Sequence, residues 1–137
     1  MLDQNTSAQL KTLLERLEGP IELVATLDGS DKSAKIQELV SEVAALSDLV
    51  TARFDGTNAR APSFGIAKAG EEPRVFFAGL PMGHEFTSLI LALLQTSGYA
   101  PKVSDEVLAN IKSLGVQSNF DVFVSLSCHN CPDVVQA

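Results

Sequence analysis

The chain has 137 residues, 45% of them hydrophobic, which is enough for one compact domain with a buried core. Its 17 acidic and 10 basic residues give a net charge of -7, which argues against nucleic acid and anionic membranes as partners, since both attract basic patches. No apolar run approaches the roughly 20 residues that span a bilayer, and the N-terminus lacks the basic start and apolar middle of a signal peptide. We therefore expect a cytoplasmic protein that docks on other proteins.

The first part of the chain alternates helical and strand patterns. Leucines recur at helical spacing from Leu10 to Leu17, and Gly19-Pro20 ends this predicted helix. The β-prone run Ile21 to Leu27 follows, and after the turn "DGS" comes "SAKIQELVSEVAAL", which again has apolar residues at helical spacing. The pattern predicts helix, strand, turn and helix in this order.

The middle of the chain predicts a second strand, a hairpin and a buried helix. The strand covers Asp48 to Phe54, and the hairpin consists of "PSFGIAKA" and "PRVFFAGL" around the turn-like "GEE". Pro62 is the first residue of the hairpin stretch and is a candidate for a cis peptide bond, because X-Pro is the ordinary site for one. The almost unbroken apolar middle of "GHEFTSLILALLQTSGY" predicts the most buried helix of the protein.

The last part of the chain predicts a linker helix, a strand and the start of another helix. Ser104 can cap a helix through about Leu114, because acidic residues fill its first turn. The run "NFDVFVSLS" predicts a strand that leads directly into "CHNCPDVVQA", where Pro132 fits an early helical position.

Two strand-turn-helix stretches, "IELVATLDGSDKSAKIQELV" and "NFDVFVSLSCHNCPDVVQA", share one plan. Ser30 and Ser33 stand where Cys128 and Cys131 stand, since 128 minus 30 and 131 minus 33 both give 98. This correspondence predicts a repeat of α/β units, with a complete first copy and only the beginning of a second. Because serine cannot exchange disulfides, we expect the first copy to be inactive in redox chemistry.

Cys128 and Cys131 are the only cysteines, and a CxxC pair in a reducing compartment is usually redox-active or metal-binding. A cysteine at the entrance of a helix lies near unpaired N–H groups and the positive end of the dipole, which favour the thiolate. We therefore predict Cys128 as the nucleophile and Cys131 as the thiol that resolves a mixed disulfide. Two alternatives remain: a zinc site that would also need His84 and His129, and a pair of inert buried cysteines.

Glu85 lies near the start of the apolar helix, beside His84. It either complements the helix dipole or handles protons for the cysteines, and the residues alone leave both roles open. No GxGxxG or other phosphate-binding loop occurs, so this chain should bind neither NADH nor FAD by the usual glycine-rich route.

The segments "GPIELVATLD", "PSF", "GHEFTSLILALL" and above all "SLSCHNCPDVVQA" closely resemble the N-terminal domain of the flavoprotein subunit of bacterial alkyl hydroperoxide reductase. The resemblance covers the whole chain, although Val124 stands where the family often has an aromatic residue. It implies an α/β, thioredoxin-like fold in tandem. Residues 1–100 would form a vestigial thioredoxin-like fold without cysteines, and residues 101–137 would begin a second, truncated one that carries the CxxC motif.

The resemblance also implies a function. Electrons would pass from NADH through FAD, both bound elsewhere in the full-length protein, to the Cys128 and Cys131 pair, and from there to a peroxiredoxin that destroys peroxide. Glu85 matches the family's glutamate that assists the redox centre, and the full-length protein would be a homodimer. The sequence stops six residues after Cys131 and lacks the rest of the second fold, so by this resemblance it looks like a fragment. A non-catalytic docking domain and a stand-alone glutaredoxin-like protein remain as alternatives.

Overall fold

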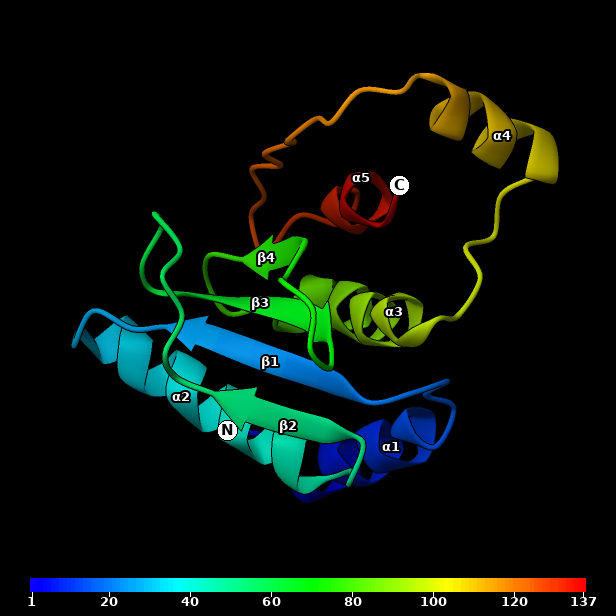
Figure 1. Cartoon of the computed structure of the whole chain (residues 1–137). Coiled ribbons are helices and arrows are strands. Elements are labelled where there is room, and N and C mark those ends of the chain that lie inside the picture. Colours follow the sequence, from blue (N-terminus) through cyan, green and yellow to red (C-terminus); the bar gives the residue numbers. More distant parts are fainter.

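The computed structural model describes residues 1–137 and contains a four-stranded sheet with helices packed against it (Figure 1). The elements in chain order are α1 (Gln4–Leu14), β1 (Ile21–Thr26), α2 (Asp31–Ala45), β2 (Val50–Arg53), β3 (Ser63–Lys68), β4 (Val75–Phe77), the 3-10 helix η1 (Gly83–Glu85), α3 (Phe86–Ser97), α4 (Asp105–Ser113) and α5 (Cys131–Gln136). The predicted order of helices and strands is confirmed through α4.

The sheet has the strand order β2-β1-β3-β4. β1 pairs with β2 in parallel, with Ile21 opposite Val50, and pairs with β3 antiparallel. β3 and β4 form the predicted antiparallel hairpin. The Ala61-Pro62 peptide bond is cis, which confirms the expectation for Pro62. This α/β arrangement of mixed strand directions places β1 and β3 in the centre of the sheet.

The main core forms on one face of the sheet. Alternate residues of β1, namely Ile21, Leu23 and Ala25, are buried in it, and side chains two apart on a strand point to the same face. Phe64 and Ile66 of β3 join them from the neighbouring strand. α1, α2 and α3 all contribute to this cluster, and in α3 only Thr87 is exposed. The prediction that α3 is the most buried helix is confirmed.

α4 lies apart from this core. Ser104 caps it as predicted by accepting a hydrogen bond from the Val107 N–H at 3.2 Å, but the helix contains no buried residue. Figure 1 shows the chain leaving α3 through α4 and returning to α5 through a long segment without secondary structure. None of the helices is long and apolar enough to cross a membrane.

The predicted strand at "NFDVFVSLS" is wrong. The segment from Gly115 to Ser127 forms no strand and pairs with no other strand. Its alternating apolar side chains fit a sheet, but a strand also needs a neighbour that accepts and donates its backbone hydrogen bonds. β2 and β4 are the edges of the sheet, and the segment adds to neither of them.

The turn "DGSDKS" between β1 and α2 is closed by hydrogen bonds of its own side chains. Ser30 caps α2 and accepts from the Ser33 N–H at 3.2 Å. The Asp28 carboxylate accepts from the Ser30 N–H at 3.0 Å and from the Ser33 hydroxyl at 2.7 Å. The prediction of a turn at this place is confirmed, and the turn also contains the cap of α2.

These bonds predict an acid-sensitive contribution to stability. Hydrogen bonds from Ser30 and Ser33 lower the pKa of Asp28 from 3.8 to about 2. Because the folded state holds the proton less tightly, this stabilisation is full above pH 3.8 and is lost as the pH falls toward 2. In urea unfolding, Asp28→Asn should be less stable than the wild type at pH 6, and the difference should shrink as the pH falls and vanish below about pH 2. Asp48→Asn, at an exposed position, is the matched control. A difference that stays constant over this pH range would contradict the assignment.

Candidate active site

The two cysteines lie in the turn that leads into α5, and both are free thiols that are partly exposed. α5 begins at Cys131, and Pro132 occupies its first turn as predicted. Cys128 therefore lies three residues before the helix. The Cys131 N–H nevertheless donates a hydrogen bond to Cys128 Sγ at 3.2 Å, so the sulfur contacts the first N–H of the helix.

The surroundings of the two sulfurs shift the pKa values of the two thiols in opposite directions. The hydrogen bond with the Cys131 side chain and those from the Asn130 and Cys131 backbone lower the pKa of the Cys128 thiol, although the negative charge of Glu85 opposes them. The contact with Cys128 raises the pKa of the Cys131 thiol. Of the two, Cys128 is the thiol that ionises more readily, and the ionised form is the nucleophile.

The serine turn and the cysteine turn share one hydrogen bond, although Ser30 directly precedes its helix and Cys128 lies three residues before α5. In each, the backbone N–H of the later residue donates to the side chain of the residue three positions earlier, and both distances are 3.2 Å. The donors are Ser33 and Cys131, and the acceptors are Ser30 and Cys128. Residues that are 98 positions apart in the sequence therefore form equivalent hydrogen bonds in the two turns.

Glu85 lies at the end of η1 and is only 2% exposed. Its side chain makes no capping hydrogen bond to α3, and both carboxylate oxygens lack any hydrogen-bond partner. Buried polar groups without a partner are rare and costly, which makes helix capping a poor explanation for this residue. η1 packs against α5, the helix that begins at Cys131, and the Glu85 charge raises the pKa of both Cys128 and Cys131.

α5 is held on the first part of the chain by a polar contact. The Gln136 side-chain amide donates to Ser88 Oγ at 3.1 Å and to Thr87 Oγ1 at 3.3 Å, and both acceptors lie in the first turn of α3. This contact brings the helix of the cysteine motif to the same end of α3 as Glu85.

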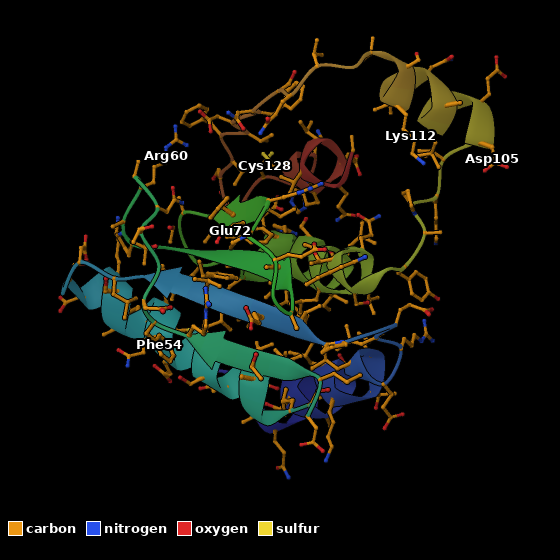
Figure 2. All side chains as sticks on the ribbon, viewed as in Figure 1. Phe54, Arg60, Glu72, Asp105, Lys112 and Cys128 are labelled. Carbon is orange, nitrogen blue, oxygen red and sulfur yellow. The ribbon has the colours of Figure 1, made fainter.

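A second contact, which the sequence analysis missed, involves Arg60 in the loop after β2. Figure 2 shows Arg60 beside the segment that leads to Cys128. Its guanidinium donates two hydrogen bonds to the Asp121 carboxylate, at 2.8 and 3.1 Å, and lies 5.9 Å from the centre of the Phe123 ring. Arg60 and Asp121 are 61 residues apart, and no local pattern relates them.

Arg60→Ala should loosen the segment before the cysteines. Exposed ion pairs contribute about 0.2–1 kcal/mol, so chymotrypsin should cleave after Phe120 and Phe123 faster by no more than about fivefold. The cleavage rate in the folded protein, followed by mass spectrometry, is the measurement. Arg74→Ala, which removes another exposed arginine, should leave it unchanged. Equal rates in both variants would show that the ion pair does not restrain the segment.

The sheet topology, with a helix after β1 and another after the β3–β4 hairpin, and the CxxC turn define the chain as a member of the thioredoxin-like class. The structure is similar to the NTD_N/C domain of the alkylhydroperoxide reductase AhpF from Enterococcus faecalis, with a TM-score of 0.82 and 25% identity over 99% of this chain and 72% of that chain. A protein disulfide oxidoreductase from Aeropyrum pernix has the same fold, with a TM-score of 0.79, 20% identity and coverage of 99% of this chain and 66% of that chain.

The sequence comparison finds relatives that match the whole chain. The F subunit of alkyl hydroperoxide reductase (AhpF) of Pseudomonas putida is 53% identical over 137 residues, and that of Escherichia coli is 52% identical over 138. Each match covers 100% of this chain and 26% of the relative. No protein-family model matches the chain. The chain is therefore similar over its whole length to AhpF subunits, and it spans about a quarter of the length of these relatives.

Proposed function

We propose that the chain is a dithiol-disulfide electron-transfer domain that passes electrons to the peroxiredoxin partner of alkyl hydroperoxide reductase. The observation that carries the proposal is the hydrogen bond from the Cys131 N–H to Cys128 Sγ in a turn that stabilises the Cys128 thiolate. A thiolate at the start of a helix, with a second thiol three residues later, is the arrangement that disulfide exchange needs.

The exchange has two steps. The Cys128 thiolate attacks one sulfur of the partner's disulfide, which forms a mixed disulfide and releases the partner's other sulfur as a thiolate that takes up a proton. Cys131 then loses its proton and attacks Cys128 Sγ, so that the partner leaves as a dithiol and Cys128 and Cys131 become a disulfide. Two electrons move to the partner in this sequence. In this proposal, reduction of the new disulfide would use FAD and NADH bound in a part of the full-length protein that this chain does not span.

We propose that Glu85 is the proton carrier of this exchange. The thiol of Cys131 must lose a proton before it can attack, and Glu85 is buried near both sulfurs with two free acceptor oxygens. A carboxylate in this position can take the proton in the resolving step and return it when the pair is reduced again.

We further propose two units, with a complete vestigial thioredoxin-like fold at residues 1–100 and the beginning of a second at residues 101–137. The buried hydrophobic residues of the core all precede residue 101, which supports this boundary. After it, several large apolar side chains are exposed, and a surface of this kind usually packs against another part of a protein. They include Val107, Ile111, Leu114, Val116, Phe120 and Phe123.

The proposed function is tested by mixing the pre-reduced chain with an oxidised peroxiredoxin of the same system and counting free thiols on each protein after separation. Transfer of two electrons per chain to the peroxiredoxin is the expected result. Insulin serves as a second disulfide substrate that needs no specific docking. A chain that binds the peroxiredoxin but reduces neither substrate would instead be a docking domain.

A further inference from the structure

Three successive residues of η1 lie against the cysteine segment. Gly83 has φ +61, and a Cβ placed on it would lie 3.4 Å from the carbonyl oxygen of Leu126, so the two backbones run close together here. Glu85 ends η1, and η1 packs against α5, the helix that begins at Cys131. Between them, the His84 ring lies against the ring of His129, with 4.3 Å between the ring centres and an angle of 59° between the planes.

The contact between the two imidazoles is one of ring packing. His129 lies between Cys128 and Cys131 in the sequence, so its backbone forms part of the turn that brings the Cys131 N–H to Cys128 Sγ. A contact that restrains the His129 ring therefore restrains this turn. The function described so far uses neither histidine.

We propose that His84 is a positioning residue, whose ring packs on His129 and holds the cysteine turn in the conformation that stabilises the Cys128 thiolate. The inference rests on the proposed function only in that it concerns the same pair of cysteines. A tilted aromatic pair at this separation shifts the equilibrium toward the packed arrangement by a factor of about two to ten. Loss of the ring should therefore lower the reactivity of Cys128 by a similar factor.

The test is the rate constant for alkylation of Cys128 by iodoacetamide at pH 7 in the pre-reduced chain, with the modified sulfur assigned by mass spectrometry. His84→Ala should slow the reaction about two- to tenfold, whereas His84→Phe, which keeps an aromatic ring, should restore it to near the wild-type rate. His129→Ala should have an effect similar to that of His84→Ala. The double variant should be no slower than the slower single variant, because both changes remove one contact.

Three outcomes would overturn the proposal: an unchanged rate in His84→Ala, a rate in His84→Phe as low as in His84→Ala, or additive effects in the double variant. His84 is exposed, so its replacement should leave the fold intact. The midpoint of thermal unfolding of each variant checks this. Alkylation involves no partner disulfide. A failure of electron transfer to the peroxiredoxin would therefore leave this result interpretable, and the two proposals can fail separately.

Discussion

Cys131→Ser is expected to convert the chain into a trap for its electron acceptor. Cys128 would still attack the partner's disulfide, because the backbone N–H of residue 131 that contacts Cys128 Sγ remains in place. The mixed disulfide would then persist, because serine cannot attack the Cys128 sulfur. A covalent adduct should accumulate with the oxidised peroxiredoxin and appear on non-reducing electrophoresis.

Cys128→Ser is the matched control and should give on the order of tenfold less adduct. The Cys131 N–H donates its hydrogen bond to position 128, so in this variant it faces a hydroxyl and stabilises no thiolate. Both adducts must disappear on addition of dithiothreitol. More adduct with Cys128→Ser would reverse the roles of the two sulfurs, and no adduct with either variant would favour a docking domain.

Glu85→Gln is expected to slow electron transfer about 100-fold, because loss of a positioned acid or base typically costs about 10²- to 10⁴-fold. The amide has nearly the same size as the carboxylate, so the fold should be retained. The measurement is the rate of disulfide reduction by the pre-reduced chain, followed by stopped flow.

A second substitution of Glu85 should increase the stability of the protein, although loss of the carboxylate slows electron transfer. The carboxylate of Glu85 is buried without a hydrogen-bond partner, so Glu85→Met should raise the free energy of unfolding by about 1–3 kcal/mol. A residue that lowers stability yet supports transfer is retained for its function.

Glu106→Gln is the control for both experiments. It likewise removes an acid near the start of a helix, but Glu106 is exposed on α4, and neither transfer nor stability should change by more than a small amount. If Glu85→Gln behaved like Glu106→Gln, Glu85 would only complement the dipole of α3.

Local patterns in the sequence were sufficient for most of the first unit. The helical spacing of leucines and valines, the caps at Ser30 and Ser104 and the turn residues around the hairpin act within a few residues of each other. For this reason α1 to α4 and β1 to β4 could be predicted from the sequence. The offset of 98 between the serine and cysteine turns also lies in the sequence, and the same hydrogen bond occurs in both turns.

The predicted strand at "NFDVFVSLS" is wrong because its formation depends on a distant part of the chain. The alternation of apolar residues records which side chains favour burial, but a strand exists only where a second strand lies beside it. In the structure no other strand lies beside this segment, and the ion pair of Asp121 with Arg60 joins it to the loop after β2 instead. No local pattern contains this information.

The environment of the cysteines likewise depended on the tertiary structure. The sequence identified Cys128, Cys131 and Glu85 as residue types with suitable chemistry, and it left open whether the glutamate capped a helix. Only the packing of α5 and the cysteine turn against α3 and η1 placed Glu85 near the sulfurs and His84 against His129, across gaps of more than 40 residues. Contacts of this kind depend on how whole elements pack, because that packing decides which distant side chains share a site.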